Sequence, residues 1–324
     1  MVAVFGDLRP QDDYTHAPGP EPDFNESAYY NFFDQGQGLG GWMRIGNRVN
    51  EGYAEVTLAL YLPDGSVLFS YQRPEISGND AFEAAGMRFQ VLEPFLRHRT
   101  TYEGETVLLT DPVRMADQPG QTLREGPRRQ VRLDLQHEAI GPVFGAGGQR
   151  PAEGLERVLG QAHFEQHMRI SGSIEIDGER LSVEALGLRD HSWGPRTWQA
   201  IPRYRWLPCA FSPDLGIRAW IIYLPDGSVA QEMVVARGPE RLERAAELEF
   251  SEELRPGTPY QHSFAIRATL ESGERLEVQG RVRSLLPLRN RRAGHVTSIG
   301  EAMTEYLCNG LAGLGISEYL EQVR

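Results

Sequence analysis

A seven-residue segment occurs twice in this chain, letter for letter. The segment Tyr-Leu-Pro-Asp-Gly-Ser-Val stands at 61–67 and again at 223–229, an offset of 223 − 61 = 162 residues in a chain of 324. At residue frequencies of about 5% each, such a coincidence is expected on the order of once in ten thousand unrelated sequences. The repeat therefore indicates an internal duplication with a period of half the chain.

Residues around the repeated segment predict strands and hairpins. Apolar, β-prone runs at 56–60 and 219–222 enter the two Pro-Asp-Gly turns, as a β-hairpin requires. Apolar and polar residues alternate at 131–135 and 263–270, which is the period of a half-buried strand. Hairpins at this spacing are typical of meander sheets that close or pack face to face. We therefore expect an all-β chain of two tandem antiparallel β-barrels or sandwiches.

The duplication and a flexible connection predict two domains. Residues 139–154 hold five glycines and two prolines, the composition of a connecting segment. We expect an N-terminal β domain at 1–160 and a C-terminal β domain at 161–324, each long enough to bury its own core.

Helix is expected only in short pieces, at 239–248 and 298–307. In the second piece, Glu301 and Glu305 would share one helical face, and we expect them to be a solvated pair.

Composition and charge exclude several classes of protein. A formal net charge of −12 repels phosphate backbones, so we expect no nucleic-acid partner. No stretch approaches the roughly 18 consecutive apolar residues of a membrane span, and the N-terminus lacks a signal-peptide pattern, which predicts a cytoplasmic protein. Cys209 and Cys308 are the only cysteines, too few for a disulfide framework or a thiolate zinc site. We expect no cofactor.

The densest polar and aromatic cluster directly follows a predicted strand. A plain hairpin turn needs only Gly, Asp or Asn, so this cluster suggests more than a turn. In a structural interpretation, its acid pairs with an arginine while its indoles plug one end of a barrel. In a functional one, Asp190 is an acid at the edge of an apolar cavity, where desolvation raises the pKa of a carboxyl, and His191 is its partner or the base. The cluster comprises Arg189, Asp190, His191, Trp193, Arg196 and Trp198.

Aromatic residues elsewhere could line the same cavity. Tyr204 and Trp206 follow the cluster, and Trp42 has roughly their place in the first half by the offset of the repeat. Indole and phenol faces stabilise positive charge through cation–π attraction, although an aromatic residue on a predicted strand is more often part of a core. His163 and His167 have the i, i+4 spacing of a helical zinc site, but the following residues indicate a strand and no third ligand is apparent, so we expect no metal site.

The run Arg-Asp-His-Ser-Trp-Gly-Pro-Arg at 189–196, the upstream His-Phe-Glu-Gln at 163–166 and the duplicated layout resemble the carotenoid 1,2-hydratase (hydroxyneurosporene synthase)-like group of tandem lipocalin-like, AttH-like proteins. The resemblance covers most of the chain in architecture and is close only around residues 163–198. It implies two lipocalin-like barrels and acid-assisted addition or removal of water at an isoprenoid or other apolar alkene, or ring closure in a shaped pocket. It also implies that His163 faces the cavity.

Two functions follow from these observations. In the first, the protein is an enzyme, a hydratase, dehydratase, isomerase or cyclase, in which Asp190 and His191 act on a small hydrophobic substrate. In the second, it is a non-catalytic carrier of a lipophilic ligand, and the cluster is a structural lock. Edge strands could also join two copies into a homodimer.

Overall fold

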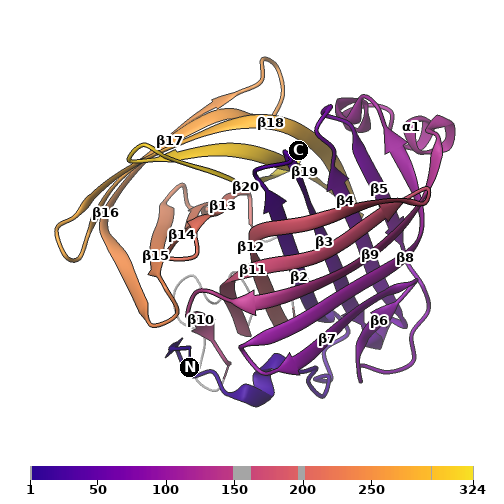
Figure 1. Ribbon diagram of the computed structural model, residues 1–324, viewed down its shortest axis with the longest axis horizontal. Helices are drawn as coiled ribbons and strands as arrows, with labels where there is room; N and C mark the ends of the chain where they lie inside the picture. The colour runs from indigo at the N-terminus through magenta and orange to yellow at the C-terminus, as the bar shows by residue number, and fades with distance from the viewer. Residues whose placement is uncertain (1, 149–161, 196–200, 293, 324) are drawn as a thin grey trace.

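The computed structural model describes residues 2–148, 162–195, 201–292 and 294–323. Within these ranges the protein is all-β with a lipocalin-like fold, and a single short α-helix accompanies the strands. Figure 1 shows two strand assemblies side by side, the first coloured indigo to rose and the second orange to yellow. The expected fold class is confirmed.

Eight strands in the described part of residues 24–195 close into a barrel. They are β2 (Phe24–Asp34), β3 (Leu39–Arg48), β4 (Tyr53–Tyr61), β5 (Val67–Gln72), β8 (Arg97–Leu109), β9 (Arg128–Ala139), β11 (Ala162–Ile176) and β12 (Glu179–Pro195). Each pairs antiparallel with the next in this order, and β12 pairs back with β2.

Shorter elements surround this first barrel. Parallel strands β1 (Val4–Phe5) and β10 (Val143–Ala146) extend the sheet beside β11, and β6 (Phe82–Ala84) and β7 (Met87–Glu93) extend it beside β8. The helical segments are α1 (Pro119–Glu125) and three 3₁₀ turns at Pro10–Asp13, Val49–Glu51 and Pro112–Ala116. Among the described residues, none of the helices has both the length and the apolar character needed to cross a bilayer.

The second barrel is formed by consecutive strands. It closes in the order β13 (Arg203–Ser212), β14 (Leu215–Tyr223), β15 (Val229–Arg237), β16 (Arg241–Leu254), β17 (Gln261–Leu270), β18 (Arg275–Arg292), β19 (His295–Cys308) and β20 (Leu311–Val323).

Three apolar clusters follow from this arrangement. One fills the first barrel, around residues such as Phe32 and Leu58, and another fills the second, around Ile266 and Val278. The third lies between the barrels, because the strands that face each other carry apolar side chains on their outer faces as well. This interface cluster contains Tyr29, Phe33, Trp42, Tyr61, Tyr204, Trp206, Leu286, Met303 and Ile316 among others.

The division between the barrels corrects the expected boundary at 160/161. Strands β11 and β12 pair with β9 and β2 of the first barrel, and the second barrel begins only at Arg203. The reason is closure, because the chain before residue 149 supplies six of the eight strands and the β11–β12 hairpin must complete the barrel. The motif that begins at Arg189 therefore starts on the first barrel.

Both expected helices are wrong. Residues 241–248 belong to β16 and residues 298–307 to β19, where pairing with neighbouring strands overrides local helical preference. The expected solvated pair is wrong too, since Glu301 is buried and Glu305 is exposed.

Both copies of the repeated segment form the predicted hairpin turn. The Ser66 backbone N–H and hydroxyl donate to Asp64 Oδ1 at 3.0 and 2.6 Å, and Ser228 donates to Asp226 Oδ1 in the same way at 2.9 and 2.6 Å. The flanking strands nonetheless turn opposite faces inward. Tyr61 lies in the interface cluster, whereas its counterpart Tyr223 packs against the interior cluster of the second barrel.

Candidate active site between the two barrels

A cavity lies between the barrels and has walls from both. Its volume is about 90 Å³, room for a few water molecules or for the reacting end of a larger molecule. Four of the predicted site residues line it, two from each barrel: His163, Asp190, Tyr204 and Trp206. The remaining lining residues are Ser27, Tyr29, Arg44, Trp220, Ile222 and Glu318.

A histidine and a carboxylate form a pair on the first barrel's wall of this cavity. Because side chains alternate along a strand, His163 and Glu165 of β11 and Asp190 of β12 all point outward, toward the second barrel. Glu165 stands opposite Asp190 in the strand register, and the His163 Nε2 atom hydrogen-bonds Asp190 Oδ2. The two side chains are only 14% and 18% exposed, so the pair sits at the cavity edge with little access to bulk water.

Glu165 ties this pair to the second barrel. It is fully buried, accepts a hydrogen bond from Trp206 Nε1 at 2.7 Å and forms an ion pair with Arg218 Nε at 2.6 Å. Burial raises the pKa of Glu165, and the Arg218 guanidinium opposes that rise. These contacts hold Trp206 in the cavity wall beside His163 and Asp190.

Aromatic rings form the other walls. The Arg218 guanidinium lies 3.7 Å above the Trp220 ring, and His163 is 5.7 Å from that ring on a tilted plane. Tyr29 meets Trp206 edge-on at 5.4 Å. Trp42 stands one layer behind, stacked on Tyr29 at 5.8 Å, and does not itself line the cavity.

The predicted Asp190–His191 pair is not formed. Neighbouring residues of a strand point to opposite faces, and Asp190 faces the cavity while His191 faces the interior of the first barrel. The His191 Nε2 atom hydrogen-bonds Glu26 Oε1 at 3.0 Å. The imidazole beside Asp190 is instead that of His163, on the neighbouring strand.

Arg189 and Trp193 also point into the first barrel. Arg189 is 2% exposed and donates to Asp13 Oδ1 at 2.5 Å and to Gln166 Oε1 at 3.0 Å. Trp193 stacks on His16 at 3.9 Å. These contacts fasten the N-terminal segment to the barrel and belong to packing rather than to the cavity. The other two members of the cluster, Arg196 and Trp198, lie outside the described residues.

Sequence reasoning also missed a buried carboxyl whose cross-strand neighbour, Glu318, lines the cavity. Glu301 of β19 is 4% exposed, and its Oε2 atom has no hydrogen-bond partner among the described residues. Burial raises the pKa of Glu301 to about 8, opposed only by the Arg44 charge. A signal was present, because Ile299, Glu301 and Met303 share a face if the segment is a strand, which places the carboxyl in an apolar row.

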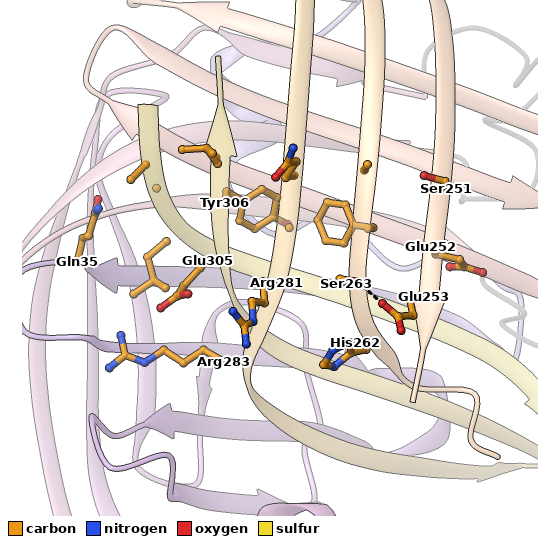
Figure 2. Close-up of a pocket in the computed structure, with 18 residues that line it drawn as sticks. Gln35, Ser251, Glu252, Glu253, His262, Ser263, Arg281, Arg283, Glu305 and Tyr306 are labelled. Carbon is orange, nitrogen blue, oxygen red and sulfur yellow. Dashed lines mark hydrogen bonds between the residues drawn. The ribbon is translucent and has the colours of Figure 1, made fainter. Parts of the chain in front are cut away.

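A larger cavity lies on the second barrel, away from these residues. Its volume is about 880 Å³, and Figure 2 shows its polar lining, with Arg281 and Arg283 beside Glu305 and with Glu253 bonded to Ser263. None of the predicted site residues lines it. Most of its lining side chains are exposed and charges of both signs alternate, so it is an open groove.

Two clusters bring nitrogen and oxygen atoms close enough together to share a metal ion. In each, hydrogen bonds within the protein already engage the histidine and carboxylate atoms, which accounts for the geometry without an ion. The clusters are His163–Glu165–Asp190 and His16–Glu26–His191.

A family model described as a domain of unknown function (DUF7064) matches residues 9–323, nearly the whole chain. The chain belongs to this family. No curated protein matches it in sequence.

Solved structures resemble this family member along its full length. An AttH candidate from Nitrosomonas europaea has a TM-score of 0.61 and 18% identity, over 94% of this chain and 95% of that one. Kievitone hydratase from Nectria haematococca has a TM-score of 0.58 and 12% identity, over 99% and 96%. CghA with Sch210972 has a TM-score of 0.57 and 10% identity, over 99% and 97%. At these identities the likeness shows a shared fold, in agreement with the expected lipocalin-like architecture.

Proposed function

We propose that this protein binds a small hydrophobic molecule at the cavity between its barrels and catalyses acid–base-assisted addition or removal of water, or a related isomerisation or cyclisation. The observation that carries the proposal is the His163–Asp190 pair at the edge of a cavity whose lining includes four aromatic side chains. One of the similar structures is named a hydratase, which is in keeping with this class of reaction.

The pair has the composition of a general acid–base. A carboxylate that accepts a hydrogen bond from an imidazole orients the ring and stabilises its protonated form, so His163 can take a proton from water and return it within one turnover. A positioned acid–base of this kind contributes roughly 10²–10⁴-fold to a rate. Asp190 therefore keeps a catalytic role, with His163 in the place that the sequence suggested for His191.

The aromatic walls suit an apolar substrate that acquires positive charge. Indole and phenol faces attract cations by about 0.5–2 kcal/mol, with the larger values in desolvated sites. Arg218 already occupies one face of Trp220, which leaves the rings of Tyr204 and Trp206 as the main surfaces for this contact.

The test compares Asp190→Asn with the wild-type protein on a panel of terpenoid alkenes and alcohols. Mass spectrometry follows the gain or loss of one water and any change in retention at constant mass. Asp190→Asn and His163→Gln should each reduce turnover at least 100-fold. Glu184→Gln, on the exposed part of the same strand, is the matched control and should keep full activity. Full turnover in Asp190→Asn contradicts the assignment.

Native mass spectrometry on protein purified gently from its source identifies the ligand class. A co-purifying apolar molecule, released by denaturation, supports the binding part of the proposal. If that molecule is bound but returned unchanged by wild-type protein under all conditions, the non-catalytic carrier is the better account.

A further inference from the structure

Glu301 of the second barrel lies next to the cavity lining, one strand beyond Glu318 and on the side away from the His163–Asp190 pair. On β19 it stands opposite Glu318 of β20, and Glu318 stands opposite Trp206 of β13. Glu318 and Trp206 both line the cavity. On the first barrel the corresponding row runs from Asp190 of β12 through Tyr29 to Arg44 of β3. The two rows face each other, so Asp190 and Glu301 lie toward opposite ends.

The groups that act electrostatically on Glu301 belong to the first barrel. The charge of Arg44 opposes the rise in the pKa of Glu301. The charge of Glu301 in turn raises the pKa of Tyr29 and of Tyr61. Arg44 is already engaged with Glu55 at 3.3 Å. Burial keeps the pKa of both phenols well above the usual value, so they stay neutral around the carboxyl. Glu301 therefore points across the interface into surroundings that favour its neutral form.

A neutral carboxyl can donate through the Glu301 Oε2 atom, and none of the described residues accepts that hydrogen bond. Buried polar groups are nearly always paired, and an exception next to a cavity points to a ligand atom as the missing partner. The matching group on a ligand is a hydrogen-bond acceptor, and in an apolar molecule this is most simply a carbonyl oxygen.

We propose that Glu301 is the acid of this site and that the substrate is an apolar molecule with a carbonyl oxygen conjugated to its reacting double bond. This inference rests on the function proposed above. A weak acid protonates an isolated alkene poorly, whereas a hydrogen bond to a conjugated carbonyl draws electrons toward the oxygen and opens the far carbon of the double bond to water.

Groups at the two ends of the cavity then supply the proton transfers that the addition of water requires. The water oxygen bonds to the far carbon while His163, held by Asp190, takes a water proton, and the Glu301 O–H proton moves to the carbonyl oxygen to give an enol. The enol returns its O–H proton to the Glu301 carboxylate as its carbon takes the proton from the His163 imidazolium. Both groups end as they began, and the reverse sequence removes water.

The protonation of Glu301 is tested without any substrate. Because burial raises the pKa of Glu301 to about 8 in the folded protein, its contribution to stability is lost as pH rises through that value. Glu301→Gln should remove the fall in midpoint denaturant concentration between about pH 6 and pH 9 that this group causes. Infrared difference spectra between the same pH values should lose a protonated-carboxyl band in this variant. Glu305→Gln, on the same strand but exposed, is the matched control and should keep both signals.

The donor role is tested with 2-cyclohexenone, a small apolar enone. Its carbonyl stretch should shift to lower frequency when wild-type protein is added, and Glu301→Gln should weaken that shift, since an amide is a poorer donor than a carboxylic acid. Asp190→Asn should keep the shift, because Asp190 acts at the other end.

The outcomes separate this inference from the proposed function. A carbonyl shift that is absent in wild type, or unchanged in Glu301→Gln, overturns the role of Glu301 even if Asp190→Asn abolishes turnover of some alkene. The role of Glu301 is also overturned if the protonated-carboxyl band and the pH dependence of the midpoint denaturant concentration both persist in Glu301→Gln. Conversely, a shift that depends on Glu301 in a protein without turnover upholds the binding of an enone and counts against the proposed catalysis.

Discussion

Adjacent residues of β12 serve two different environments. On its inner face, Arg189 and His191 bond to buried carboxylates and fasten the N-terminal segment to the first barrel. On its outer face, Asp190 pairs with His163 at the edge of the cavity. The inner contacts are buried inside the first barrel, whereas the outer pair lies at the edge of the cavity. One dense run of polar residues thus holds two sites back to back, and substitutions at neighbouring positions should separate stability from activity.

The largest loss of folding stability is expected from Arg189→Met, a change on the inner face of β12. The change leaves Asp13, which is buried, without its guanidinium partner, so that its contacts with His98 at 3.2 Å and with the Phe95 backbone N–H at 2.5 Å remain. Breaking a buried ion pair from one side costs about 3–5 kcal/mol. Urea unfolding followed by tryptophan fluorescence measures the loss, and adding Asp13→Asn should recover part of it. An unchanged midpoint in Arg189→Met would show that the inner network contributes little to stability.

The second-largest loss of stability is expected at low pH, where protonation of Glu26 weakens the contacts on the inner face of β12. Burial by itself favours the protonated form of Glu26, but hydrogen bonds from His16 and His191 outweigh it and lower the pKa of Glu26 to about 2. Since the folded pKa is depressed, the stabilisation is present above the unfolded value and is lost as pH falls from about 5 toward 2, by about 3 kcal/mol in total. Unfolding free energies measured across this range should fall less steeply in Glu26→Gln. Parallel curves for the two proteins would contradict the assignment.

The smallest effect on stability is expected from Asp190→Asn. Asparagine has nearly the shape of aspartate and keeps an oxygen that can accept the hydrogen bond from His163, so the change costs about the net worth of one hydrogen bond, about 1 kcal/mol. The variant should therefore unfold within about 1 kcal/mol of wild type while losing activity. A loss as large as that of Arg189→Met would make Asp190 a structural residue and would remove the difference between the two faces.

Much of the local structure could be predicted from the sequence. The two Pro-Asp-Gly turns and the alternating segments were recognisable because turn chemistry and the period of two are local properties. The two segments expected to be helical, 239–248 and 298–307, show the limit of such reasoning. Their residues tolerate a helix, but pairing with neighbouring strands satisfies more backbone groups and buries more apolar surface.

The site could be predicted only in part. The motif and the upstream His163 drew attention to the correct strands, and four of the predicted residues meet at one cavity. The partner of Asp190 could not be derived from adjacency in sequence, because the adjacent histidine, His191, lies on the other face of the strand. Glu301 could not be found by motif either, because its raised pKa results from burial in the folded protein.

By itself, the sequence determined the β class, the two hairpin turns and the strands that carry the polar residues. Only the tertiary structure decided where the first barrel closes, which side chains face the cavity and which carboxyl groups are buried between the barrels. The physical reason is the period of the strand, because a shift of one residue in pairing exchanges its two faces. The repeated segment shows this directly: identical residues form the same turn, yet Tyr61 and Tyr223 point to different cores.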